Sequence, residues 1–330
     1  MAKKTSHNIV KDIFAPSKPK KGEKWLLPVE WSMVIYALFT LILVLFTSTN
    51  LHDADTMAWE RVRVVLITAM LWASYRVWPC RFMIGIRILF LLILLSWWYP
   101  DTYELNRQFA NLDHVFAAWE QAVFGCQPAL LWSQTMSSPI VSELMDFGYM
   151  MYFPMFAVFI IYLFFKDFDK MMRVAFVIIT SFYIFYVIYD LLPVTGPQYY
   201  YLAAGIDNIA AGTFPDIGTY FATCQERMPS PGWEDGLFHR LLEAMHSEGE
   251  RPTAAFPSSH VGVATITMYL AIKLREWRYA IIIAVPYLLL CLSTVYIQAH
   301  YAIDAIAGFI VAFPVAISLD LLYVRRIKKN

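Results

Sequence analysis

The chain has 330 residues, of which 59% are hydrophobic, 17% aromatic and 16% charged, and its mean hydropathy is +0.50. An average soluble domain carries roughly 25% charged residues, so this composition argues against a soluble globular protein and against a disordered one. The 26 basic and 26 acidic residues give a formal net charge of zero, which removes nucleic acid as a default partner. The four cysteines have no Cys-x-x-Cys spacing, so no zinc or redox motif is indicated.

Apolar runs of about bilayer length, roughly 20 residues, divide most of the chain. They are continuous rather than alternating, so they predict helices and not barrel strands. The runs are 31–49, 62–77, 82–98, 144–165, 172–192, 261–274, 279–297 and 302–324. The second and sixth are short, and a six-span alternative makes the second and third a re-entrant pair. We expect an all-α polytopic membrane protein with about eight transmembrane helices.

Basic residues are distributed unevenly about these runs. With the N-terminus inside, 20 of the 26 fall on the inner side and six on the outer side. The excess of inner positive charge predicts an integral, multi-pass protein with both termini in the cytoplasm. The seven lysines of the first 24 residues precede any apolar run, so we expect an uncleaved first helix.

The same pattern predicts a domain organisation. We expect a basic cytoplasmic tail at 1–30, N-terminal transmembrane helices at 31–98, an outer amphipathic segment at 99–142, a catalytic membrane domain at 143–324 and a cytoplasmic tail at 325–330. The amphipathic segment either lies at the membrane interface or caps the bundle. Within the catalytic domain, residues 193–257 are rich in Gly, Pro, Tyr and acidic groups and predict a structured outer loop. Cys126 and Cys224 both fall outside, where a disulfide can persist, but no spacing supports their pairing.

Two of the seven histidines stand at the ends of predicted spans. His260 opens the sixth run in Phe256-Pro-Ser-Ser-His260, and His300 lies between the last two in Gln298-Ala-His300-Tyr-Ala-Ile-Asp304. Two spans joined by a short inner turn return the chain to the same level. The topology therefore places both histidines at the outer, extracytoplasmic membrane face, periplasmic or lumenal.

These residue types suit phosphoryl transfer. His300 and Asp304 are i and i+4, so a helix puts them on one face, where a carboxylate fixes the imidazole tautomer. His260 follows Ser258 and Ser259 at a helix start, where unpaired N–H groups favour an anion. A single interfacial histidine is usually a satisfied polar residue. Two histidines beside an anion site instead favour catalysis, one attacking phosphorus and the other protonating the leaving oxygen.

At these residues the chain resembles the type 2 phosphatidic acid phosphatase superfamily, over about residues 144–324. The resemblance rests on Phe256-Pro-Ser-Ser-His260, Ser293-Thr294 and the run from His300 to Gly308. It implies a six-helix phosphatase-type core in which His300 is the nucleophile, Asp304 its orienting acid and His260 the general acid. The family chemistry needs no metal and no cofactor.

The departures from that family are informative. Its phosphatases carry Lys, six residues and Arg-Pro upstream, where this chain reads Tyr189 to Pro197, and Ser-Arg where it reads Ser293-Thr294. A dianionic monoester needs that positive cradle more than a monoanionic diester does. The pattern is similar to the inositol phosphorylceramide synthase and sphingomyelin synthase branch. Within it, Ser293-Thr294 and the Gly-Pro-Gln-Tyr-Tyr that begins at Gly196 most resemble the inositol phosphorylceramide synthases.

Further polar residues are candidates for substrate contact. Gly196, Pro197 and Tyr199 follow the fifth span, and the tyrosines near it either meet a polyol headgroup or form an aromatic belt. Asp146 and Asp190 lie near outer span ends, where acids are either functional or solvated. Arg227 and Arg251 are possible replacements for the missing cations, and Arg87 is expected to snorkel to the inner surface.

The sequence thus favours a lipid phosphotransferase. It would move a phosphoinositol or similar headgroup from a glycerophospholipid donor to a ceramide-like acceptor through a phosphohistidine, with no obligate protein partner. The alternative enzyme is a lipid phosphate phosphatase with water as acceptor. A transporter is a third possibility, disfavoured because the spans lack charge at mid-depth.

Overall fold

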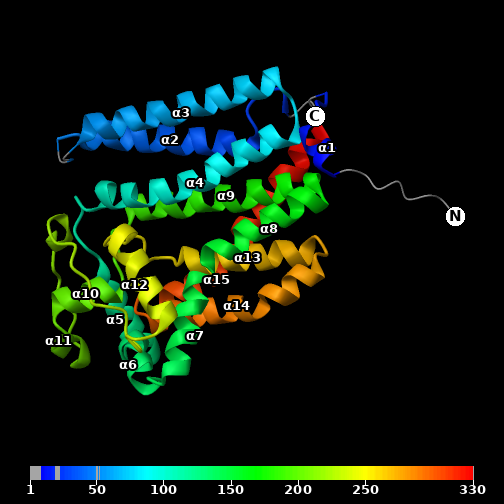
Figure 1. Cartoon of the computed structure of the whole chain (residues 1–330). Helices are drawn as coiled ribbons and strands as arrows, with labels where there is room; N and C mark the ends of the chain where they lie inside the picture. Colours follow the sequence, from blue (N-terminus) through cyan, green and yellow to red (C-terminus); the bar gives the residue numbers. More distant parts are fainter. Residues whose placement is uncertain (1–8, 19–22, 50, 52, 330) are drawn as a thin grey trace. The chain divides into compact units, whose positions relative to one another are not determined.

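The computed structural model describes residues 9–18, 23–49, 51 and 53–329, and every regular element among them is helical (Figure 1). The chain forms two compact units, one of Met1–Ser96, Ile160–Thr180 and Leu319–Asn330, the other of Trp97–Phe159 and Ser181–Ser318. The helices are α1 (Ile9–Phe14), α2 (Pro28–Thr47), α3 (Ala54–Val77), α4 (Arg81–Asn106), α5 (Asp113–Phe124), α6 (Pro128–Thr135), α7 (Pro139–Met150), α8 (Tyr152–Lys166), α9 (Phe168–Leu191), α10 (Pro197–Ala204), α11 (Ile206–Ala210), α12 (Leu237–Gly249), α13 (Ser259–Lys273), α14 (Trp277–Tyr296) and α15 (Ala302–Lys329).

The first unit contains the N-terminal helices, with α2 and α3 packed side by side (Figure 1). Proline at the first position of α2 suits a helix start, since that N–H has no intrahelical partner. Arg87 of α4 is fully buried, and its Nε donates to Glu30 Oε1 of α2 over 2.7 Å. The expectation that Arg87 snorkels is therefore wrong. A buried carboxylate within reach holds the guanidinium inside the unit instead of at the surface.

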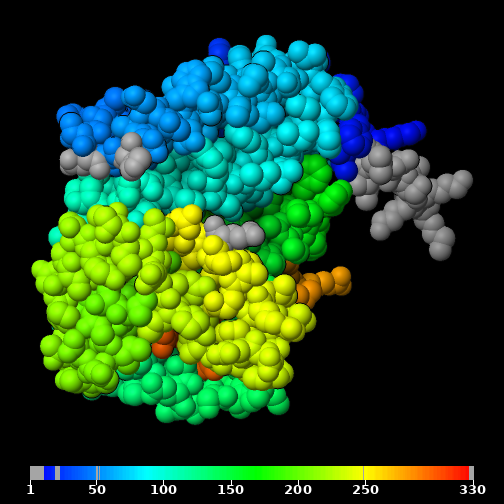
Figure 2. Space-filling model, turned by 60° about the vertical axis from the view of Figure 1, so that its left-hand side comes forward, coloured from blue at the N-terminus to red at the C-terminus, as the bar shows by residue number. Residues whose placement is uncertain are grey.

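The second unit is built on α14, which packs against both α13 and α7. Residues 99–142 and 193–257 also belong to this unit. The α5 and α6 helices contribute Phe116, Ala117 and Ala129 to a cluster of buried residues that includes Tyr200 and Tyr301. The 193–257 segment forms a continuous surface on the visible face, with α12 beside the preceding loops (Figure 2). Phe116 of the amphipathic segment is buried, whereas Trp119 and Val123 are exposed, so its position at the interface or as a bundle cap stays a prediction.

Within the described residues, five helices are long and apolar enough to cross a membrane: α2, α4, α9, α14 and α15 over Ala302–Arg326. The pair α7 and α8 makes a sixth candidate, bent by 47° at Met151. These helices fit an integral multi-pass membrane protein.

Two of the eight expected spans do not meet this criterion. The run at 62–77 belongs to α3, a helix of 24 residues whose first half carries Glu60, Arg61 and Arg63. The run at 261–274 belongs to α13, which has 15 residues and is about 22 Å long at 1.5 Å per residue. The bend lies in the fourth run, whereas the re-entrant alternative had placed a break in the second and third.

Some expectations concern residues outside this description. The lysines at positions 3, 4, 20 and 21 of the basic tail and residue 330 of the C-terminal tail lie outside the described residues. Cys126 and Cys224 are both free and half-buried.

Candidate active site

The two histidines singled out in the sequence lie together in the second unit. His300 belongs to the short connection between α14 and α15, and His260 lies in the first turn of α13. Although 40 residues separate them, His300 Nε2 and His260 Nδ1 are 3.3 Å apart. A hydrogen bond at this distance requires one of these nitrogens to donate and the other to accept.

The backbone fixes the orientation of His300. Its Nδ1 lies 2.8 Å from the carbonyl oxygen of Ala255, so Nδ1 carries the proton and Nε2 keeps a lone pair. Asp304 Oδ2 is 3.7 Å from the same Nδ1 and instead accepts a 2.9 Å bond from the Tyr301 backbone. The group that selects the tautomer is thus Ala255, and Asp304 acts on the backbone beside His300 through its bond from the Tyr301 N–H.

Burial keeps this imidazole neutral. His300 is 3% exposed, and desolvation lowers its pKa to about 4, against the opposing effects of the Ala255 hydrogen bond and the Glu250 charge. An uncharged imidazole with a lone pair on Nε2 is the form that attacks an electrophile, and here that lone pair accepts from His260 Nδ1.

His260 is held between aromatic rings. Its ring centroid lies 4.6 Å from that of Tyr149 and 4.1 Å from that of Tyr152. Two N–H groups at the start of its helix already have protein acceptors. Val261 donates to Ser258 Oγ at 3.4 Å, and Ser259 donates to Tyr189 Oη at 2.9 Å. Ser258 and Ser259 therefore shape the turn that presents His260.

At two glycines of these motifs another segment of backbone lies too close for a side chain to fit. Gly196 has φ +92°, and a Cβ there would lie 2.5 Å from the carbonyl oxygen of Ala299, the residue before His300. A Cβ on Gly308 would lie 2.3 Å from the carbonyl oxygen of Ser258. Gly196 with Pro197 and Gly308 thus allow the neighbouring segments to press against the two histidine-bearing turns.

Sequence reasoning missed a carboxyl group that interacts electrostatically with His300. Glu250, at the C-terminal end of α12, accepts a 2.9 Å bond from Tyr99 Oη and interacts electrostatically with His300. Burial raises the pKa of this carboxyl group, while the Tyr99 bond and nearby positive charges oppose the shift. No periodic pattern marks Glu250, because it follows the last residue of α12, five residues before Ala255.

The two arginines considered as replacement cations are also located. Arg227 Nη2 donates to Glu243 Oε2 at 2.8 Å, so a carboxylate already balances its charge. Arg251 Nη1 donates to the carbonyl oxygen of Glu250 at 2.8 Å. Tyr199 is buried and interacts electrostatically with Glu250 and both arginines.

The two acids near span ends are both buried. Asp146 Oδ2 lies 3.3 Å from His239 Nδ1 of α12, so this acid joins α12 to α7. Asp190 lies at the end of α9, and its role in substrate binding stays a prediction. Among the described residues, no group of three His, Cys, Asp or Glu side chains is placed to hold a metal ion.

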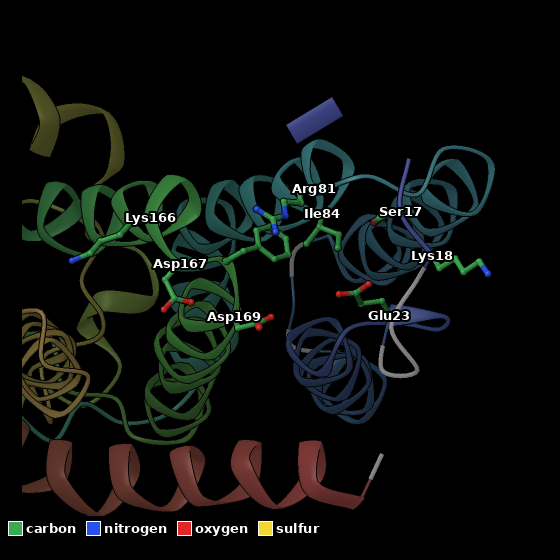
Figure 3. Close-up of a pocket in the computed structure, with 9 residues that line it drawn as sticks. Ser17, Lys18, Glu23, Arg81, Ile84, Lys166, Asp167 and Asp169 are labelled. Carbon is green, nitrogen blue, oxygen red and sulfur yellow. The ribbon is translucent and has the colours of Figure 1, made fainter. Parts of the chain in front are cut away.

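A separate charged pocket of about 420 Å³ lies in the first unit. Figure 3 shows that its charged side chains come from the segment before α2, the start of α4 and the α8–α9 junction. It contains Lys18, Glu23, Arg81, Lys166, Asp167 and Asp169. Neither histidine of the candidate site lines it.

The helical fold and the paired histidines define a class, that of multi-pass membrane proteins with a histidine site suited to phosphoryl transfer. The family model of the PAP2 superfamily matches residues 114–318, which include both histidines and Asp304. The chain therefore belongs to the PAP2 superfamily. No curated protein and no solved structure matches it. Membership supports enzymatic phosphoryl transfer of the lipid phosphatase or phosphotransferase kind.

Proposed function

We propose that this protein is a lipid phosphotransferase that moves a phosphoinositol headgroup from a glycerophospholipid to a ceramide or dihydroceramide. The two lipids are its partners in the membrane, and the reaction uses no cofactor. One observation carries the choice between diester and monoester. Arg227 is paired with Glu243, so of the two candidate cations only Arg251, which bonds a neutral carbonyl oxygen, is without a carboxylate partner in a hydrogen bond, and one cation suits a monoanion better than a dianion.

The positions that hold cations in the phosphatases support the same choice. Tyr189 is buried and donates to the carbonyl oxygen of Pro257, and Thr294 is buried and donates to that of Cys291. Gly196 has no side chain. Each charge-assisted hydrogen bond contributes about 1.5–3 kcal/mol. A dianionic monoester loses more from the missing bonds than a monoanionic diester does.

The reaction follows from the two imidazoles. The Nε2 lone pair of His300 attacks phosphorus, and the bond from phosphorus to the diacylglycerol oxygen breaks. His260, entering this step as the imidazolium, gives a proton to that oxygen and becomes neutral. The ceramide hydroxyl then loses its proton to His260, and its oxygen attacks the phosphohistidine and releases His300. His260 lies 3.3 Å from the attacking nitrogen, so the substrate must break this hydrogen bond between the two histidines. His260 keeps its contacts with Tyr149 and Tyr152 during this step.

The walls of the proposed site are formed by Ser258, Ser259, Gly196 and Pro197. We propose that the headgroup contacts Tyr199, Arg251 and Asp190.

We place this site on the extracytoplasmic face and both termini in the cytoplasm, because basic residues divide 20 to 6 between the two sides. Single cysteines at Lys18 and Asp207, in a cysteine-free background, test the orientation. An impermeant thiol reagent on intact cells should label the second and spare the first. The reverse pattern contradicts the orientation.

The substrate is tested with purified protein in detergent micelles. Labelled phosphatidylinositol, with and without ceramide, is compared with phosphatidic acid at equal surface concentration. We expect ceramide-dependent headgroup transfer and little phosphate release. Faster release of phosphate from phosphatidic acid would make the protein a phosphatase.

A further inference from the structure

Two buried carboxyl groups of α5 take no part in the reaction described above. Asp113 begins this helix and Glu120 lies seven residues further on, so both project from one face. Each is fully buried. A buried acid is costly unless hydrogen bonds satisfy it, and burial raises the pKa of both groups, that of Glu120 to about 7. Their hydrogen-bond donors show what they hold.

Asp113 joins the two segments that flank His300. Its Oδ1 accepts from the Gly196 backbone at 2.9 Å and from Tyr301 Oη at 3.0 Å. Its Oδ2 accepts from the Thr195 backbone at 2.7 Å and its hydroxyl at 2.9 Å, and from Asn111 Nδ2 at 2.6 Å. Gly196 in turn presses on Ala299, so this carboxylate fixes both neighbours of His300.

Glu120 fixes the residues that follow. Its Oε1 accepts from the Ala302 backbone at 3.1 Å and its Oε2 from the Ile303 backbone at 3.0 Å. These N–H groups belong to the first turn of α15, where no intrahelical acceptor exists. The start of α15 is thereby anchored to α5, and with it Asp304.

We propose that Asp113 and Glu120 are positioning residues that clamp residues 299–303 and so aim His300 at its substrate. The proposal rests on His300 being the nucleophile of the proposed function. The hydrogen bonds of the His300 imidazole go to Ala255 and His260, both outside residues 299–303, so this segment positions the ring only through its backbone. Its direction is therefore set by the backbone that α5 holds, and misplacement of about 1 Å lowers a rate by about 10²-fold.

The second unit offers a matched control. Glu143 of α7 accepts bonds from the backbones of Phe238 and His239 at 3.1 Å, at the start of α12. It thus performs the same chemistry as Glu120, on a helix start that does not carry His300. Glu143→Gln reproduces the loss of a helix-capping carboxylate without touching residues 299–303.

Activity is the first readout. Asp113→Asn and Glu120→Gln should each lower kcat by about 10- to 100-fold and change KM less than about twofold. Tyr301→Phe, which removes only one bond to Asp113, should lower kcat by less, and Glu143→Gln should leave it within about twofold. A rise in KM with unchanged kcat, or equal losses in Glu143→Gln, would overturn the proposal. If Asp113→Asn does not fold, the kcat of Tyr301→Phe relative to wild type tests the proposal instead.

The second readout does not depend on the substrate. Diethyl pyrocarbonate modifies accessible neutral imidazoles, and His300 and His239 are 3% and 4% exposed. With modification located by mass spectrometry, Glu120→Gln should accelerate that of His300 severalfold and leave His239 unchanged. Glu143→Gln should do the reverse. Equal protection of His300 in Glu120→Gln and wild type refutes the clamp, whereas an inactive wild type with the expected labelling refutes only the proposed reaction.

Discussion

The two units of this protein treat buried charge in opposite ways. In the first, carboxylates lie against guanidinium groups. Arg87 bonds Glu30 at 2.7 Å, and Arg173 Nη2 bonds Asp320 Oδ2 at 2.7 Å. In the second, the carboxylates around His300 accept from neutral donors. Glu250 bonds a tyrosine hydroxyl, and Asp304 and Glu120 bond backbone N–H groups. The first arrangement neutralises charge for stability, and the second satisfies carboxyl groups near a reactive imidazole with neutral donors instead of a bonded guanidinium.

Removal of the nucleophile should have the largest effect on activity. We expect His300→Ala to lower kcat by at least about 10³-fold, because no other group supplies the attacking lone pair. Asp304→Asn should cost less, since Ala255 continues to orient Nδ1. Headgroup transfer is measured at equal amounts of folded protein. Normal turnover by His300→Ala would eliminate the histidine mechanism.

Disruption of an ion pair in the first unit should affect stability instead. Arg87→Met leaves Glu30 buried without its cation, at a cost of about 3–5 kcal/mol. We expect a much lower unfolding midpoint in detergent, with kcat per folded molecule within about twofold. The double variant Arg87→Met, Glu30→Leu should recover most of the stability. A folded Arg87→Met protein without activity would show that the two units do not divide these tasks.

The Glu250 carboxyl group, which interacts with His300, should control the choice of substrate. Glu250→Gln removes a negative charge that repels a dianion more than a monoanion, so turnover of phosphatidic acid relative to phosphatidylinositol should rise about tenfold. Tyr99→Phe is the control, because it removes the hydrogen bond and keeps the carboxylate. If the turnover of phosphatidic acid relative to phosphatidylinositol is unchanged in Glu250→Gln, then Glu250 does not determine substrate selectivity.

The pH dependence should report the buried state of His300. Its pKa is about 4 in the folded protein, below the ordinary 6.5. The neutral nucleophile therefore persists on acidification, and kcat/KM should fall only as the pH approaches 4. The stability gained from burying neutral imidazole is complete above pH 6.5 and declines as the pH falls from 6.5 towards 4. An acidic limb of the activity profile near pH 6.5 would contradict the burial of this residue.

Sequence patterns located the helices and the two histidines better than their surroundings. Apolar runs mark α2, α9 and α14, because a helix that crosses a bilayer needs a long continuous apolar stretch. The antiparallel connection of α13 and α14 predicts that His260 lies near His300. The run ending at residue 98 does not reveal that α4 continues to Asn106, which puts Tyr99 in reach of Glu250.

The missed site residues share a physical reason. Ala255 acts through its carbonyl oxygen, which every residue possesses. Asp113, Glu120 and Glu250 belong to segments between the predicted spans, where acids are common and their direction depends on tertiary packing. The buried position of Arg87 likewise depends on Glu30, a residue of another helix. A local sequence pattern does not predict an ion pair between two helices.

The central claim is that Nε2 of His300 carries the headgroup during transfer. Its most direct test is a rapid-quench reaction of the purified protein with labelled phosphatidylinositol in the absence of ceramide, followed by peptide mass spectrometry under alkaline conditions that preserve phosphohistidine. We predict a phosphoinositol adduct on His300 that disappears when ceramide is added, with formation of labelled ceramide product, and that never forms in His300→Ala. An adduct on a different residue, or headgroup transfer by His300→Ala at the wild-type rate, would contradict the account.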